Sequence, residues 1–179
     1  NNSNLISTSA MDETTKGNNA GLSEFGVSAI KRMNEVGMLV DVSHLSEQGF
    51  WDVMEISTSP IIASHSNCYA LNPHYRNLSD EQIKAIAENG GYIGINFYDK
   101  FLIEKIPSGG ASIEIVLDHI DHIKNIAGVD CIGIGSDFDG GITPPNELYD
   151  ATQYPELTKG LVERGYTETE IRKILGGNF

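Results

Sequence analysis

Hydrophobic positions along the chain alternate between helical and strand-like spacing. Apolar residues recur every three or four positions from Leu22 to Val36, which predicts a helix ended by Gly37. The apolar run that follows, residues 38–42, predicts a strand. The same alternation continues, with helices predicted over 46–56, 79–88, 112–127 and 167–176, and strands over 60–64, 91–98 and 131–136.

Strands that alternate with helices indicate an α/β fold built on a parallel sheet. The strands are almost wholly apolar, which is typical of a sheet covered on both faces. A length of 179 residues favours one domain. We therefore expect a loop over residues 1–20, which are rich in Asn, Ser and Thr, and successive helix–strand units over residues 21–179.

Composition excludes several classes of function. A net charge of −13 argues against a nucleic-acid partner, because a polyanion would be repelled. Cys68 and Cys131, the only cysteines, indicate reduced thiols and no disulfide framework. No apolar stretch reaches the roughly 20 residues that span a bilayer, so we expect no membrane segment and a soluble chain.

Polar side chains follow the predicted strands at the point where each strand ends. His44 and His65 follow the first two strands, Asn96 lies in the third, and Asp137 follows the fourth. In parallel α/β folds the carboxyl ends of the strands meet at one edge, where sites form. Two imidazoles and a carboxylate at such an edge predict a divalent-metal site. The alternative for each histidine alone is a hydrogen-bonded loop residue.

Asp137 lies in the segment "GIGSDFDGG", in which Gly133 and Gly135 permit close packing of a strand. If the chain stays extended, Asp137 and Asp139 point to the same side. A carboxylate here can take a proton from a metal-bound water and deliver it to a leaving amine. The alternative is a turn at residues 139–141, which has turn chemistry in any case.

Four other polar residues need separate interpretation. Arg76 lies in a loop, where its guanidinium can hold a substrate carboxylate; the alternatives are an exposed arginine or one paired with Asp80. His119 and His122 share a helix face and so mimic a metal pair, but they lie far from any strand end. We expect these two on the outside of the helix layer, and His74 as an ordinary loop residue.

A resemblance to a known family rests on motifs that span almost the whole chain in order. It is carried by "GLSEFG", "MNEVGMLVDVSHLS", "PIIASHSNCYAL", "RNLSDEQIKAIAENGG", "GINFY", "LDHIDHIKNIAGVD", "IGIGSDFDG" and "YPELTKGLVERGYTETEIRKILGGNF". In these motifs the chain resembles the membrane dipeptidase (renal dipeptidase) family of zinc peptidases, which have a TIM-type (β/α)₈ barrel of the metal-dependent amidohydrolase type.

The resemblance implies a binuclear zinc site that hydrolyses dipeptides through a metal-activated water. By the family pattern, His44 and His65 bind one zinc, Arg76 binds the substrate's terminal carboxylate, and Asp137 is the acid/base residue. The family's remaining ligands, a His-x-Asp motif and a bridging glutamate, belong to residues that precede this segment. We therefore expect the carboxyl-terminal half of the barrel, with the amino-terminal half absent and at most one zinc partly held.

Three functional hypotheses follow. The first is a zinc-dependent dipeptidase, active as the parent protein but inactive as the isolated segment. The second is a non-catalytic fragment or interaction module, whose open sheet edges favour pairing with the missing half of the barrel or with a second copy in a homodimer. The third is another amidohydrolase-type enzyme that acts on cyclic amides or lactams. Free cysteines and the absence of a leader favour a cytoplasmic protein.

Overall fold

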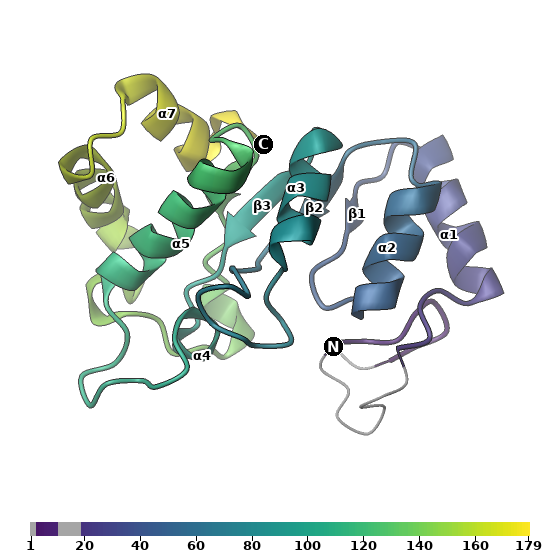
Figure 1. Ribbon diagram of the computed structural model, residues 1–179, viewed down its shortest axis with the longest axis horizontal. Helices are drawn as coiled ribbons and strands as arrows, with labels where there is room; N and C mark the ends of the chain where they lie inside the picture. Colours follow the sequence, from purple (N-terminus) through teal and green to yellow (C-terminus); the bar gives the residue numbers. More distant parts are fainter. Residues whose placement is uncertain (1–2, 11–18) are drawn as a thin grey trace.

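Four parallel strands form the centre of the fold, and helices connect them (Figure 1). The computed structural model describes residues 3–10 and 19–179. Each strand pairs in parallel with the next along the chain, in the order β1-β2-β3-β4. The strands are β1 Val40–Asp41, β2 Ile61–Ala63, β3 Tyr92–Ile95 and β4 Ile132–Ile134. The predicted α/β fold with a parallel sheet is confirmed.

Every helix predicted from the spacing is present. These are α1 Glu24–Glu35, α2 Glu47–Ile56, α3 Asp80–Glu88, α5 Ile113–Ala127 and α7 Glu168–Arg172, the last continued by a π-helical turn, Lys173–Gly177. Two further helices were not predicted, α4 Asp99–Leu102 and α6 Tyr154–Glu163. Short 3₁₀ turns occupy Phe138–Gly140, Asn146–Leu148 and Ala151–Gln153.

The helix ends agree with the sequence signals. Ser79 and Thr167 both form complete capping boxes. In each, the hydroxyl accepts a hydrogen bond from the backbone N–H three residues later, and the side chain of that later residue accepts one from the backbone N–H of the cap residue. Gly37 follows α1 with φ of 71°, a left-handed conformation that glycine adopts at little cost. Local chemistry thus fixes where these helices begin and end.

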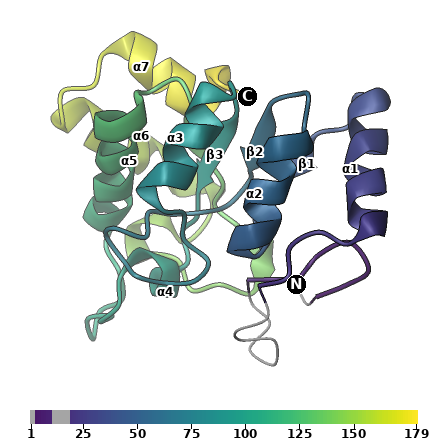
Figure 2. The same ribbon diagram turned by 45° about the vertical axis from the view of Figure 1, so that its right-hand side comes forward.

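The helices lie side by side along the sheet (Figures 1 and 2). Helix α1 packs on α2, α3 on α5, and α5 on α6, while α3 and α5 also contact β3. Alternate residues of the strands and their extensions are buried beneath them, as Val40 in β1 and Val42 just after it are. Between these two, Asp41 is exposed, and Ile62 at the equivalent place in β2 is only half-buried. The predicted coverage of both faces is therefore incomplete at these strands.

The helical stripe predicted for residues 22–36 is only partly buried. Ile30 is 5% exposed, whereas Phe25 and Val36 are 61% and 51% exposed. The fully buried side chains of β2, β3, β4 and the inner face of α5 belong to the core instead. Cys68 and Cys131 are buried free thiols, as predicted. Over residues 3–10 and 19–179, we find no helix with the length and apolar character needed to cross a bilayer.

Candidate metal centre and active site

The carboxyl ends of the four strands bring the predicted site residues to one edge of the sheet. Backbone hydrogen bonds carry the ladder past the strands themselves, from Val42 N to Ile62 O at 2.8 Å and from Gly135 N to Ile95 O at 3.0 Å. The side chains that follow the ladder are His44, His65, Asn96 and Asp137, which we call the strand-end cluster. Parallel pairing in consecutive order is what places them together.

Two histidines from neighbouring strands face each other. The Nε2 atoms of His44 and His65 lie 2.8 Å apart, and their ring centroids are 4.8 Å apart. Both side chains are half-buried. Two imidazole nitrogens that converge on one point are suitable donors for a single divalent cation.

Backbone strain is concentrated in the strand-end cluster. Among the described residues, His44 and Asp137 are the two non-glycine residues with positive φ, at 77° and 65°. Such conformations cost free energy and persist where the surroundings enforce them, often at functional sites. For His44, Ala10 N and Ser9 Oγ donate to its carbonyl oxygen at 2.8 and 3.1 Å.

The left-handed conformation of Asp137 ends the extended chain before Asp139. The chain does not stay extended after Asp137 but enters the 3₁₀ turn Phe138–Gly140, closed by a hydrogen bond from Gly140 N to Asp137 O. The extended chain on which the shared direction of Asp137 and Asp139 depended is therefore absent. The predicted turn at residues 139–141 is confirmed.

Glycines let neighbouring strands approach the turn that carries His65. A Cβ at Gly135 would lie 1.9 Å from Ser64 O, and a Cβ at Gly94 would lie 2.1 Å from the same oxygen. No side chain fits at either position without moving the backbone of β2. Gly94 of β3 and Gly135 of the "GIGSD" segment thus fix the position of Ser64 and of the histidine after it.

An asparagine pair holds the carboxylate of Asp137. The Asn96 amide Nδ2 donates to Asp137 Oδ2 at 3.1 Å, and its Oδ1 accepts from Tyr98 N at 2.6 Å. Asn67 fixes Asn96 in turn, since its side chain donates to Asn96 O at 3.0 Å and accepts from Asn96 N at 2.9 Å. Asn67 and Asn96 are fully buried. Asp137 therefore has a fixed place beside the histidine pair.

Arg76 is buried, and neither alternative interpretation of it holds. Its side chain is 3% exposed and lies over the Phe101 ring, with 5.3 Å between the guanidinium carbon and the ring centroid. Asp80 pairs instead with His122 at 2.8 Å. Within the described part of the chain, Nε and Nη2 of Arg76 are buried without hydrogen-bond partners. A buried guanidinium with unused donors is suited to bind an anion.

Charges link Arg76 to the strand-end cluster. Burial, followed by the positive charge of Arg76, lowers the pKa of His44 to about 4 and lowers that of His65 as well. Burial also lowers the pKa of Arg76 to about 10, while the negative charges of Asp137 and Asp41 oppose this shift. At neutral pH both imidazoles are therefore neutral, the form that binds metal, and Arg76 is charged.

The residues present fit part of a metal site. Two neutral imidazoles supply donor nitrogens, and Nδ1 of His65 is hydrogen-bonded at 2.7 Å to Ser64 Oγ, as the second ring nitrogen of a metal-binding histidine usually is. Residues 3–10 and 19–179 contain no group of three or more His, Cys, Asp or Glu side chains that could hold a cation. The described chain thus provides two donor positions.

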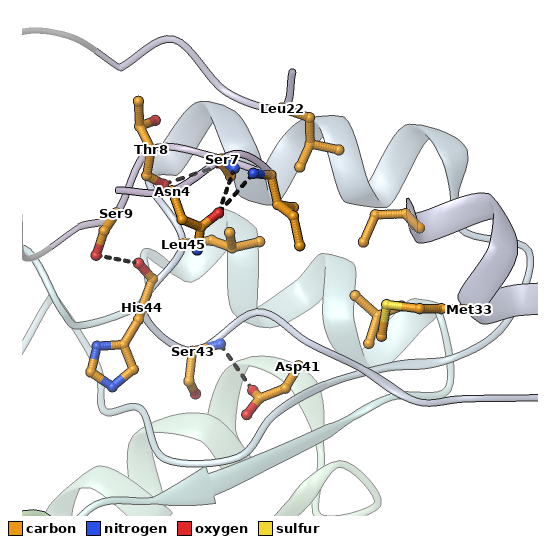
Figure 3. A pocket seen from close by; sticks show the side chains of 13 residues that line it. Asn4, Ser7, Thr8, Ser9, Leu22, Met33, Asp41, Ser43, His44 and Leu45 are labelled. Atoms are coloured by element: carbon orange, nitrogen blue, oxygen red, sulfur yellow. Dashed lines mark hydrogen bonds between the residues drawn. The ribbon is translucent and has the colours of Figure 1, made fainter. Parts of the chain in front are cut away.

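A pocket of about 340 Å³ adjoins the His44 end of the cluster (Figure 3). Its lining comes from the segment before α1, from α1 itself and from β1 and the residues after it. Apolar side chains such as Leu22 and Met33 line one part, and Asp41, Ser43 and His44 line another (Figure 3). His65, Arg76 and Asp137 do not line it, so the pocket touches the candidate site at one end.

The other histidines have structural places. The prediction that His119 lies on the outside of the helix layer is wrong, because its side chain is fully buried. Its Nδ1 accepts from Cys68 N at 3.1 Å, and its Nε2 donates to Leu102 O at 3.0 Å. His119 thus joins α5 to α4 and to the loop that leads to Arg76. His122 is half-buried beside Asp80, and His74 packs against Tyr75 of its own loop and Phe101 of α4.

Burial of His119 predicts a pH-dependent stability. Burial lowers its pKa from 6.5 to about 4, although the hydrogen bond to Leu102 O opposes the shift. Stability from this group is complete above pH 6.5 and falls as the pH drops towards 4, because only the unfolded chain then binds the proton. We expect the free energy of unfolding to fall by up to about 3 kcal/mol.

Chemical denaturation at several pH values between 7.5 and 4.5 would measure this effect. The comparison is with His119→Gln. The glutamine amide can also accept a hydrogen bond through its oxygen and donate one through its nitrogen, but it does not titrate in this pH range. The wild type should lose more stability than the variant as the pH falls. Equal losses in the two proteins would exclude His119 as the source.

Sequence reasoning missed the residues that support the histidines. Asp41 accepts hydrogen bonds from Ser43 N and Ser64 N, both at 3.0 Å, and from Ser64 Oγ at 2.5 Å. The signal was available, because a lone carboxylate between Val40 and Val42 breaks an otherwise apolar strand. Asn67 carried no comparable signal, since an asparagine in a loop is ordinary.

Comparison with known proteins gives consistent matches. The sequence pattern of the membrane dipeptidase family (peptidase family M19) matches residues 1–179. An uncharacterized Klebsiella pneumoniae protein from the pqqA 5′ region is 41% identical over 160 residues, which are 89% of this chain and 59% of the relative. Curated relatives of this kind are therefore longer than the chain.

Solved structures match over most of the chain. A metallopeptidase from Rhodobacter sphaeroides, liganded with a phosphinate mimic of the dipeptide L-Ala-D-Ala, is 40% identical with a TM-score of 0.84. The match covers 88% of this chain and 45% of that one. An amidohydrolase from Pseudomonas aeruginosa is 31% identical with a TM-score of 0.85, covering 99% of this chain and 60% of the other.

Proposed function

Because the chain belongs to the membrane dipeptidase family of peptidases, we propose that the protein is a zinc-dependent dipeptidase whose catalytic centre includes the strand-end cluster. One observation carries the proposal. The Nε2 atoms of His44 and His65, 2.8 Å apart, share one edge of the sheet with a fixed carboxylate and lie in the field of a buried arginine. Metal-assisted hydrolysis of a dipeptide uses residues that bind the metal, a residue that transfers the proton, and a residue that binds the free carboxylate of the substrate.

Each residue has a definite role in this proposal. His44 and His65 would hold one metal ion through Nε2. Arg76 binds the free carboxylate of the substrate with the donors that have no partner in the described chain. Asp137 takes a proton from the attacking water and delivers it to the leaving amine. A cation held there would supply the Lewis acidity that lowers the pKa of water and polarises the scissile carbonyl.

Zinc is the metal that the donor types favour. Neutral imidazole nitrogen suits Zn²⁺ among the divalent ions, and hydrolysis needs no redox chemistry. Two donors do not complete a tetrahedral site. We propose that residues outside this chain supply the other ligands and a second zinc position.

The sheet supports a place within a (β/α)₈ barrel. Its strands are parallel and in consecutive order, which is the order in such barrels and differs from doubly wound sheets. The open face at Asp41 and Ile62 would then point to the barrel interior. On this proposal the 179 residues form the carboxyl-terminal half of the barrel.

A substrate panel tests the proposed activity. The natural, full-length polypeptide, loaded with zinc, should hydrolyse L-Ala-L-Ala or L-Ala-D-Ala with kcat/KM of about 10⁴ M⁻¹s⁻¹ or more. The phosphinate dipeptide mimic bound by the Rhodobacter relative motivates the second substrate. Dipeptide amides should be much poorer substrates, because they lack the carboxylate that Arg76 binds. Activity only on other substrates would contradict the proposal.

A second candidate is an amidohydrolase that acts on cyclic amides or lactams. The Pseudomonas aeruginosa amidohydrolase, similar over 99% of this chain, favours it. The same metal and Asp137 chemistry would serve such substrates, but they need no receptor for a free carboxylate. Hydrolysis of lactams in the same panel, with no activity on dipeptides, would support this candidate.

A further inference from the structure

Asp41 collects hydrogen bonds from the two turns that carry the histidines. Its Oδ1 accepts from Ser43 N, next to His44, and from Ser64 N, next to His65, both at 3.0 Å. Figure 3 shows Asp41 and Ser43 beside His44, with the first of these contacts drawn. Its Oδ2 accepts from the hydroxyl of Ser64 at 2.5 Å. One carboxylate thus links the ends of β1 and β2.

The hydroxyl of Ser64 has only one proton, and this decides its other contact. A carboxylate can only accept, so the Ser64 proton is directed to Asp41. Ser64 Oγ must then accept from His65 Nδ1, which lies 2.7 Å away. A neutral imidazole with its proton on Nδ1 has its lone pair on Nε2.

We infer that Asp41, acting through the Ser64 hydroxyl, fixes His65 in the Nδ1–H tautomer and so keeps Nε2 ready to bind the metal. Asp41 and Ser64 are then positioning residues. This inference deepens the proposed function and rests on it for the identity of the ligand. Metal-binding histidines commonly donate their second ring N–H to a carboxylate or to another acceptor, which orients the ring and raises its basicity.

His44 has no equivalent support, which makes the histidine pair asymmetric. With its lone pair on Nε2, His65 accepts the proton in the 2.8 Å contact, so His44 carries its proton on Nε2. Nδ1 of His44 is then an acceptor, and in the described part of the chain it is buried without a partner. His44 must move its proton to Nδ1 before its Nε2 can bind a metal. His65 needs no such change.

The surroundings keep Ser64 in place for this role. Gly94 and Gly135 pack against its carbonyl so closely that no Cβ fits, which prevents the turn from shifting. Ser43 Oγ accepts from His65 N at 3.0 Å and fixes the backbone of the histidine. The hydroxyl of Ser64 therefore remains between the Asp41 carboxylate and the imidazole.

A purely structural role for Asp41 would use only Oδ1, which joins the two turns. The Asp41→Asn variant separates the two roles. Its amide oxygen can still accept from both backbone N–H groups, but its NH₂ would donate to Ser64 Oγ. The Ser64 proton is then free to donate to His65 Nδ1, which reverses the tautomer.

Ring ¹⁵N chemical shifts of the metal-free, full-length protein, labelled in histidine, test the inference directly. In the wild type, His65 should have a protonated Nδ1 and an unprotonated Nε2. Asp41→Asn should exchange these two states, and Ser64→Ala should leave a mixture. Ser57→Ala is the matched control, because its hydroxyl is bonded to Asn34 and Ser59 before β2, and it should leave His65 unchanged.

Zinc affinity, measured by competition with a chelator, is the second readout. Ser64→Ala and Asp41→Asn should each weaken binding by about 10- to 100-fold, and Ser57→Ala should not. A wild-type His65 protonated on Nε2, or wild-type affinity in Ser64→Ala, would overturn the inference. The wild-type spectrum decides this even if a variant fails to fold. If the wild type hydrolysed dipeptides while His65 carried its proton on Nε2, the inference would be refuted and the proposed function would stand.

Discussion

Replacing Asp137 with asparagine should lower kcat for dipeptide hydrolysis by about 10²- to 10⁴-fold, the usual contribution of a general acid/base. The amide has nearly the same shape but cannot take up or deliver the proton. Asparagine tolerates the left-handed conformation at this position, where φ is 65°. Its oxygen can still accept from Asn96 Nδ2. We therefore expect an intact fold and unchanged binding of zinc.

The matched control is Asp139→Asn, two residues further along the same turn. Asp139 is exposed, so its variant removes the same charge from the segment without touching the cluster. Steady-state kinetics of both variants, with the zinc content of each, make the comparison. Similar turnover in Asp137→Asn and wild type would exclude the acid/base role.

Replacing Arg76 with methionine should lower kcat/KM for dipeptides by about 10²-fold or more, because the substrate carboxylate loses a charged partner in a buried site. Dipeptide amides, which lack that carboxylate, should lose little. The fold should not suffer, since methionine removes two buried N–H groups that have no partners in the described chain. Steady-state kinetics on dipeptides and on the matching dipeptide amides measure the loss of carboxylate binding, and a thermal melt measures the stability of the fold.

Arg172→Met provides the control for this change. Arg172 pairs with Glu168 on the surface at 2.7 Å, and 76% of its side chain is exposed, so its loss should affect neither substrate. A purely structural Arg76 would give a different pattern. In that case the methionine variant would melt at a lower temperature and lose activity equally on dipeptides and their amides.

The fold was predictable where local chemistry decides it. Gly37 marked the end of the first predicted helix, as the structure confirms, and the capping boxes at Ser79 and Thr167 begin two helices within a residue of their predicted starts. Strand β3 ends earlier than predicted because Asn96 N donates to the Asn67 side chain, a partner that is distant in sequence. Helix α6 was missed although Pro155 lies in its first turn and Leu157 and Leu161 are on its buried face.

The placing of the candidate site residues at one edge of the sheet was predictable, but their hydrogen-bond partners were not. The regular appearance of His44, His65 and Asp137 after apolar runs pointed to one edge of the sheet, because parallel strands end together. Burial of His119 could not be read from helical spacing, since its partners are a backbone N–H of a loop and a carbonyl of α4. The burial of Arg76 depends on tertiary packing in the same way.

Anomalous diffraction from crystals of the zinc-loaded, full-length protein would show where the metal binds. We predict a zinc peak at about 2.0–2.1 Å from Nε2 of both His44 and His65, the usual zinc–imidazole distance. The direct contact between the two rings, now 2.8 Å, would then be replaced by two bonds to the metal. An active protein whose zinc lies elsewhere, with these histidines still hydrogen-bonded to each other, would exclude His44 and His65 as zinc ligands.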